Sequence, residues 1–116
     1  MSKRFICAAA AALLASNASA YSSKTEAVRL VARADAWGGL CVNWALHWPT
    51  AYAFLRSQRV AIRGDYRAVY GFAYADAHVD ATSYHNSPNA CDHALDLYGP
   101  FGRELPGLLR PIWHNF

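Results

Sequence analysis

The sequence lacks an apolar run long enough to cross a membrane. Its longest uncharged apolar stretch, residues 5–15, holds 11 residues, whereas a spanning helix needs roughly 20. Charged residues or histidines interrupt every later apolar stretch. We therefore expect no transmembrane segment in the chain that follows this N-terminal run.

The common enzyme motifs are also missing. The sequence has no G-x-S-x-G nucleophile motif, no glycine-rich phosphate loop and no H-E-x-x-H zinc motif. Neither Cys41 nor Cys91 has a C-x-x-C or C-x-x-H neighbour, which argues against a metal–thiolate site. We therefore expect no cofactor and favour a non-enzymatic role over an enzymatic one.

The N-terminus has the order of features typical of a secretory signal peptide. Lys3 and Arg4 precede the short apolar run, and Ala18-Ser19-Ala20 offers small residues at both positions that signal peptidase reads. We predict that residues 1–20 are removed. The working protein would then be exported, to the periplasm or the extracellular space.

The charge of the remaining 96 residues is nearly balanced but unevenly placed. These residues include nine basic and eight acidic side chains, so the net charge gives no reason to expect nucleic acid as a partner. Residues 21–70 carry a balance of +4 and residues 71–116 a balance of −3. Either the two halves pack together and neutralise each other, or one face of the protein is basic.

The two cysteines left after removal of residues 1–20 predict one disulfide, between Cys41 and Cys91. The bond would close a loop of about 50 residues, which the chain-entropy model values at about 4 kcal/mol. That is a large share of the net stability of a domain this small, about 5–10 kcal/mol.

The apolar pattern predicts an all-α fold, because no segment alternates convincingly with period two. Apolar residues recur at steps of three and four over residues 27–48, and the phase continues through Gly38-Gly39. This favours one long first helix over two separate ones, although each glycine costs a helix about 1 kcal/mol. The Trp48-Pro49 step ends that helix.

Three further helices follow. The second begins at Pro49-Thr50, the third runs from Tyr66 to about Ala81 after a cap at Asp65, and the fourth follows Ser87-Pro88 and stops at Gly99. We predict a single domain over residues 21–116: a small bundle of about four helices, with a disulfide joining the first helix to the last. From about residue 100 we expect an irregular tail whose apolar residues pack back on the body.

Four arginines recur at steps of three and four after residue 55. If the second and third helices keep register, they form one face that binds anions or a partner, since each guanidinium is a planar fork of donors. The competing interpretation is a solvated face paired with aspartates. These candidate residues are Arg56, Arg59, Arg63 and Arg67.

Tyrosines and histidines supply two weaker candidate sites. Tyr66, Tyr70 and Tyr74 recur every four residues, as in either an aromatic binding platform or a core with hydroxyls at its rim. Histidine and aspartate are the ligand types that suit zinc, although helix-end polar residues are the simpler interpretation. The candidate metal ligands are His78, His85, His93 and Asp96.

Taken together, the sequence predicts an exported helical protein that binds another exported protein, in a chaperone-like, inhibitor or immunity-type role. The alternatives are a metal-binding or small hydrolytic enzyme built on the His/Asp cluster, and a binder of anionic lipid or lipopolysaccharide through the arginines. The sequence leaves the oligomeric state open.

The signal peptide and the disulfide make one joint prediction. Intact-mass measurement of the natively secreted protein should find a chain that begins at Tyr21 and has no free thiol, because Cys41 and Cys91 are bonded. A species that still carries Met1, or one with two free thiols, contradicts this interpretation.

Overall fold

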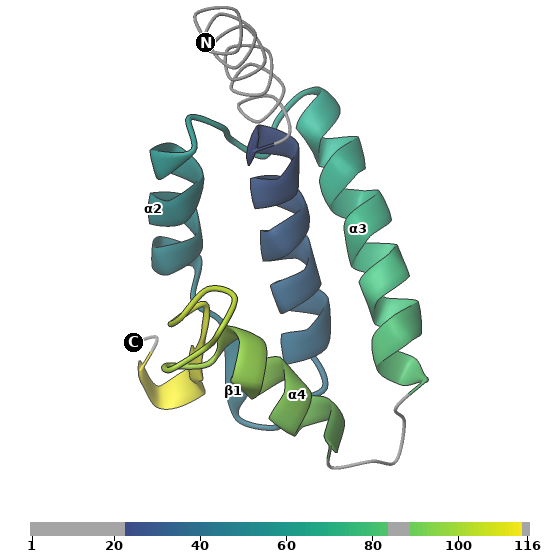
Figure 1. Ribbon diagram of the computed structural model, residues 1–116, viewed down its shortest axis with the longest axis vertical. Coiled ribbons are helices and arrows are strands. Elements are labelled where there is room, and N and C mark those ends of the chain that lie inside the picture. Colours follow the sequence, from purple (N-terminus) through teal and green to yellow (C-terminus); the bar gives the residue numbers. More distant parts are fainter. Residues whose placement is uncertain (1–22, 84–88, 115–116) are drawn as a thin grey trace, which may run out of the picture.

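The computed structural model describes residues 23–83 and 89–114, in which four α-helices pack around a small apolar core, with the first helix at its centre (Figure 1). The first, over residues 23–38, is called the central helix because α2 and α3 lie on either side of it. A two-stranded sheet and α4 lie near its C-terminal end. In chain order the later elements are β1 (Trp44–Leu46), α2 (Trp48–Ser57), α3 (Asp65–Thr82), α4 (Asn89–Tyr98), β2 (Leu109–Pro111) and a 3-10 turn, η1 (Ile112–His114).

The central helix forms the middle of the core because its apolar residues are small and recur at helical spacing. Val28, Val31, Ala32 and Ala34 are fully buried, and Trp37 is nearly so. Alanines let neighbouring helices approach closely, so that this helix is covered from both sides. The predicted apolar stripe of the first helix is therefore confirmed as far as Trp37.

The prediction of one long helix through the glycines is wrong, because the central helix ends at Gly38. Tight turns follow, with the Leu40 amide donating to the Trp37 carbonyl and the Cys41 amide to the Gly38 carbonyl. Asn43 then adopts a left-handed backbone, φ 68°, which cannot continue a right-handed helix. The chain leaves this turn as a strand.

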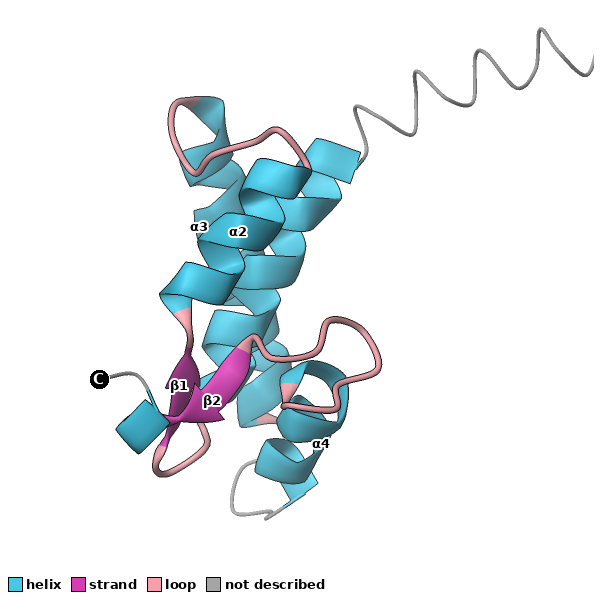
Figure 2. Cartoon of the chain, turned by 90° about the vertical axis from the view of Figure 1, so that its left-hand side faces the viewer, coloured by secondary structure: helices cyan, strands magenta, loops and turns pink. Residues whose placement is uncertain are grey.

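The fold is mostly helical rather than all-α, since β1 and β2 pair as an antiparallel sheet (Figure 2). Trp44 pairs with Pro111 and Leu46 with Leu109. The His47 amide extends the ladder by donating to the Leu108 carbonyl at 2.7 Å. Strands of three residues are too short to reveal alternation in the sequence.

The C-terminal tail packs back on the body only in part. Leu108 and Leu109 are fully buried, as expected, whereas Ile112 and Trp113 are exposed. The expectation of an irregular tail is wrong at its end, where β2 and η1 form. Pairing with β1 satisfies backbone groups that an irregular segment would leave to water.

The predicted disulfide between Cys41 and Cys91 is present, with the two Cα atoms 5.0 Å apart. Its location differs from the prediction. Cys41 lies in the turn after the central helix rather than within the first helix, and Cys91 lies in α4. The bond therefore joins α4 to the turn from which β1 departs.

The boundaries of α2, α3 and α4 agree closely with the predicted helices. Pro49 occupies the first turn of α2, where its missing amide hydrogen costs nothing. The cap of α3 is Gly64 rather than Asp65, which instead lies in the first helical turn, where the helix dipole favours a carboxylate. The proposed cap at Ser87-Pro88 lies outside the described residues.

None of the helices in the described ranges is both long and apolar enough to cross a membrane.

Two glycines give a test of the packing. An added Cβ at Gly38 would lie 2.4 Å from Cδ2 of the buried Leu109, whereas one at Gly71 would meet nothing within 4 Å. We expect Gly38→Ala to lower the free energy of unfolding by about 1–3 kcal/mol through overpacking. Gly71→Ala should raise it by roughly 0.5–1 kcal/mol, because glycine weakens a helix interior.

Urea unfolding followed by circular dichroism measures both changes. Equal stability of the two variants would contradict the close approach of β2 to the end of the central helix.

Candidate functional site

The main candidate site is a groove of about 560 Å³ bordered by α2 and α3, with the central helix beneath it. Aromatic side chains come from both flanking helices: Trp48 and Tyr52 from α2, and Tyr70 from α3. The central helix contributes Asp35. We call this the aromatic groove. Its lining also includes Arg56 and Arg63.

Aromatic rings form a continuous row from the groove along α3. The ring centroids of Trp48 lie 5.2 Å from Tyr52 and 6.4 Å from Tyr70. Tyr70 then stacks on Tyr74 at 6.4 Å, and Tyr74 on His78 at 6.2 Å. These spacings fall in the range that aromatic pairs favour. The row therefore presents a contiguous apolar surface, of which Tyr52 is half exposed.

The hydroxyl of Tyr70 donates a hydrogen bond to Oδ2 of Asp35, which ties α3 to the central helix. Burial raises the pKa of the Tyr70 phenol far above its ordinary value, and the Asp35 carboxylate adds to the effect through the hydrogen bond and its charge. The phenol therefore stays protonated and remains a donor throughout the physiological pH range. This bond holds the Tyr70 ring in place, and Trp48 of α2 packs against that ring.

The four arginines gather around the connection between α2 and α3, but not on one helical face. α2 ends at Ser57, and residues 58–64 are not α-helical, so the condition for a continuous face is not met. Arg59 and Gly64 both have positive φ in this connection. Within the described residues no salt bridge involves these arginines, and all are exposed. They are Arg56, Arg59, Arg63 and Arg67.

The structure separates these arginines into two pairs. Arg56 and Arg63 line the aromatic groove, whereas Arg59 and Arg67 do not. The sequence treats the four as equivalent because it cannot show where the connection turns. The pairing of two free cations with an aromatic wall is the feature that the structure adds.

The tyrosines also divide between roles. Tyr66 is half-buried and packs against the core, Tyr70 serves both the core and the groove, and Tyr74 is exposed. Sequence reasoning did not single out Trp48 and Tyr52 as site residues. Their four-residue spacing at the start of α2 was the available signal, because it places both rings on one side of that helix.

The described members of the His/Asp cluster do not converge on one point, although His93 and Asp96 are close enough on α4 for His93 to contribute to the lowered pKa of the Asp96 carboxyl. His78 lies at the end of the aromatic row, and His93 packs against Trp37 with ring centroids 4.8 Å apart. Asp96 accepts a hydrogen bond from Nε of Arg103 at 2.9 Å, which lowers the pKa of its carboxyl. His85 lies outside the described residues. In the ranges that the structure covers, no three such side chains are grouped as a metal would require.

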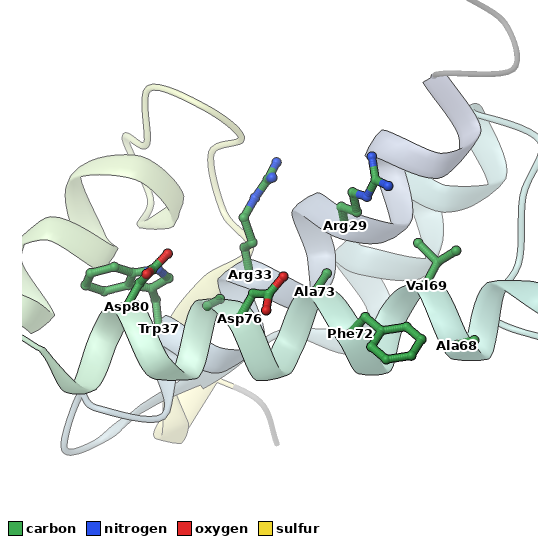
Figure 3. Close-up of a pocket in the computed structure, with 10 residues that line it drawn as sticks. Arg29, Arg33, Trp37, Ala68, Val69, Phe72, Ala73, Asp76 and Asp80 are labelled. Carbon is green, nitrogen blue, oxygen red and sulfur yellow. The ribbon is translucent and has the colours of Figure 1, made fainter.

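A second groove, of about 490 Å³, lies between the central helix and α3 (Figure 3). Arg29 and Arg33 stand on one wall, and Asp76 on the other. Both arginines already have acidic partners: Arg29 lies 2.8 Å from Glu26, and Arg33 lies 3.5 Å from Glu104. The arginines of this groove are thus less available to a ligand than those of the aromatic groove.

Comparison with known proteins identifies no relative. No protein-family model matches the chain, and neither a curated protein nor a solved structure matches it. The geometry of the aromatic groove is therefore the main indication of function.

The hydrogen bond between Tyr70 and Asp35 gives the next prediction. Tyr70→Phe removes the donor from a partly buried carboxylate, so we expect the free energy of unfolding to fall by about 1.5–3 kcal/mol. Tyr74→Phe removes an exposed hydroxyl on the same helix that has no hydrogen-bond partner among the described residues. That change should stay within about 0.5 kcal/mol.

Chemical denaturation of the two variants alongside the wild type makes the comparison. Equal stability of Tyr70→Phe and Tyr74→Phe would show that the hydrogen bond between Tyr70 and Asp35 does not stabilise the fold.

Proposed function

We propose that the protein is an exported binding protein whose aromatic groove holds a segment of another exported protein. One observation carries the proposal: an aromatic wall and two unpaired arginines, Arg56 and Arg63, border the same groove. Grooves that combine apolar walls with a few charged groups are common binding sites.

The lining defines the chemistry of the bound segment. Trp48, Tyr52 and Tyr70 suit an aromatic or aliphatic side chain, because rigid rings supply large contact area at low entropic cost. Arg56 and Arg63 suit a carboxylate, which accepts paired hydrogen bonds from a guanidinium. The preferred segment therefore carries Asp or Glu next to a large apolar residue.

The carboxylate in the groove supports a binding role. Oδ2 of Asp35 accepts the hydrogen bond from the Tyr70 hydroxyl and so holds the Tyr70 ring at the wall of the groove. Such a groove suits a chaperone-like, inhibitor or immunity-type protein, each of which recognises a segment of a partner.

Export to the periplasm or beyond is part of the same proposal. Residues 1–20 support export, because basic residues, a short apolar run and a pair of small residues follow one another in the order typical of a signal peptide. The bond between Cys41 and Cys91 supports it independently, because structural disulfides persist mainly in oxidising compartments.

A second candidate function is binding of anionic lipid or lipopolysaccharide. Arg59 and Arg67 favour it, since both are exposed near the same connection but lie outside the aromatic groove. A charged surface would use all four arginines about equally, whereas the aromatic groove uses only two. This difference separates the two functions.

Two matched double variants test the proposal. Arg56→Glu/Arg63→Glu reverses the charges in the groove, and Arg59→Glu/Arg67→Glu makes the same net change outside it. For a partner retained by wild-type protein from a periplasmic extract, we expect the first variant to weaken binding at least tenfold, because leaving the partner's carboxylate unpaired costs about 2–5 kcal/mol. The second should bind within about threefold of the wild type.

Two defined probes complete the design. A short peptide that combines Glu with Trp should shift the NMR signals of Trp48 and Tyr52, whereas a peptide with Lys in place of Glu should not. Vesicles with and without anionic lipid test the second function. Equal loss in both double variants, together with cosedimentation on anionic vesicles only, would replace the proposed function with lipid binding.

A further inference from the structure

The charged side chains of the aromatic groove are separated by sign along its length. Arg56 belongs to the last turn of α2, and Arg63 lies in the connection just before α3, so both line the end of the groove that the connection borders. Asp35, from the central helix, is the only acidic residue among the described residues that line the groove. What the groove binds therefore depends on where Asp35 lies relative to the two arginines.

The central helix places Asp35 far from the connection. This helix begins beside the connection, because the Ser23 hydroxyl donates a hydrogen bond to the side chain of Gln58, and Figure 1 shows the connection passing the start of the helix. Asp35 follows Ser23 by 12 residues, which corresponds to about 18 Å along a helix axis. The carboxylate of Asp35 therefore lies toward the opposite end of the groove from the arginines.

The arrangement of α2 gives a similar separation. Trp48 precedes Arg56 by eight residues on this helix, or about 12 Å along its axis. The Trp48 ring lies 6.4 Å from the ring of Tyr70, whose hydroxyl donates to Asp35. The groove therefore offers a carboxylate and aromatic rings near the start of α2, and guanidinium groups about 12 Å away.

The carboxylate of Asp35 has room for a second partner. It is half-buried and forms no salt bridge within the described residues. The hydrogen bond from Tyr70 uses only Oδ2, whereas the two oxygens of an ionised carboxylate have about four acceptor positions. A cation that enters this end of the groove therefore finds an acceptor of opposite charge.

The charged groups outside the groove leave the connection end positive. Lys24, Arg59 and Arg67 lie near that end and add to its positive charge. Asp65, in the first turn of α3, and Glu26, on the central helix, reduce it. The three additional cations outnumber the two carboxylates, so the polarity of the groove is kept.

Two basic groups lie near the start of α2, but neither lines the groove. Nε of Arg110 donates to the carbonyl of Gly107 at 3.3 Å. The His47 ring is hydrogen-bonded to Oγ1 of Thr50 at 2.7 Å, and burial, with the charge of Arg110, lowers the pKa of His47 and so favours its neutral form. Asp35 is therefore the charged group that a ligand meets at this end.

An extended peptide chain matches the spacing of these groups. Such a chain advances about 3.3 Å per residue, so that four residues span about 13 Å. Side chains two and four positions apart point to the same side of it. One side of a five-residue segment can therefore reach both ends of the groove, with the middle side chain against the aromatic wall.

We propose that the segment held by the aromatic groove is dipolar: a lysine or arginine meets Asp35, an aspartate or glutamate four positions away meets Arg56 and Arg63, and the large apolar residue lies midway. This inference rests on the proposed function, to which it adds the basic residue and the spacing. Two arginines against one aspartate leave the lining with a charge of +1, so the acidic residue remains the main anchor. The basic residue selects among partners, because it pairs with a carboxylate that other segments leave without a cation.

Isothermal titration calorimetry of the full, disulfide-bonded protein with defined peptides tests the inference. The probe is acetyl-Lys-Ala-Trp-Ala-Glu-amide, whose blocked ends add no charge. Replacing its lysine by glutamine should weaken binding by about three- to tenfold, because the pair with Asp35 is lost. The isomer acetyl-Ala-Lys-Trp-Ala-Glu-amide has the same composition, but its lysine points to the other side of an extended chain. It should bind as weakly as the glutamine peptide.

Two protein variants locate the partner of the lysine. Asp35→Asn removes the charge but keeps an oxygen that accepts the hydrogen bond from Tyr70, so the lysine and glutamine peptides should bind it within about twofold of each other. Asp65→Asn is the matched control, because it removes the same charge from an exposed residue outside the groove. It should distinguish the two peptides as the wild type does. Circular dichroism verifies that both variants fold, and the exchange of lysine position in the wild type decides the question if Asp35→Asn does not.

The outcomes separate this inference from the proposed function. If the wild type binds all three peptides equally but loses affinity when glutamine replaces the glutamate, the dipolar segment is wrong and the proposed function stands. If replacing the glutamate also has no effect, the proposed function is wrong and the inference falls with it. A preference for lysine that survives in Asp35→Asn would place the cation elsewhere and also overturns the inference.

Discussion

The hydrogen bond between Tyr70 and Asp35 is the contact on which the candidate site depends. α3 has 18 residues, of which only Ala77 and Ala81 are buried, while Tyr66, Val69 and Tyr70 pack against the core with part of their surface exposed. The phenol of Tyr70 adds a directed, charge-assisted bond to the central helix. Because Trp48 meets the same ring from α2, this one bond fixes the spacing of two helices and the aromatic row between them.

The disulfide and the unpaired arginines lie toward opposite ends of the molecule. The disulfide, the two-stranded sheet and α4 hold one end, where the Cys41 turn and the buried Leu108 and Leu109 meet. The connection between α2 and α3 lies at the other end (Figure 2), and the four unpaired arginines lie in it or beside it. The end opposite the disulfide therefore presents charged groups, whereas the aromatic row runs along α3 between the two ends.

The sequence predicts those features that local chemistry decides. The two cysteines that follow residue 20 permit one pairing, Pro49 marks the start of α2, and Gly99 follows the end of α4; each agrees with the structure. The predicted end of the first helix is wrong, because the spacing of apolar residues does not report the left-handed backbone conformation at Asn43. The sheet was missed because its strands are short and their pairing depends on residues far apart in the chain. The sequence identifies four arginines as a candidate site. Which of them line the groove depends on the backbone path of residues 58–64, which the sequence does not show.

The central claim is that α2 and α3 meet across the central helix and so form the aromatic groove before any partner binds. Nuclear Overhauser contacts between the indole protons of Trp48 and the ring protons of Tyr70, measured in the free protein, test it most directly. The ring centroids are 6.4 Å apart, so the account predicts clear cross-peaks between the two side chains. Their absence, with both residues assigned and the disulfide intact, would contradict it.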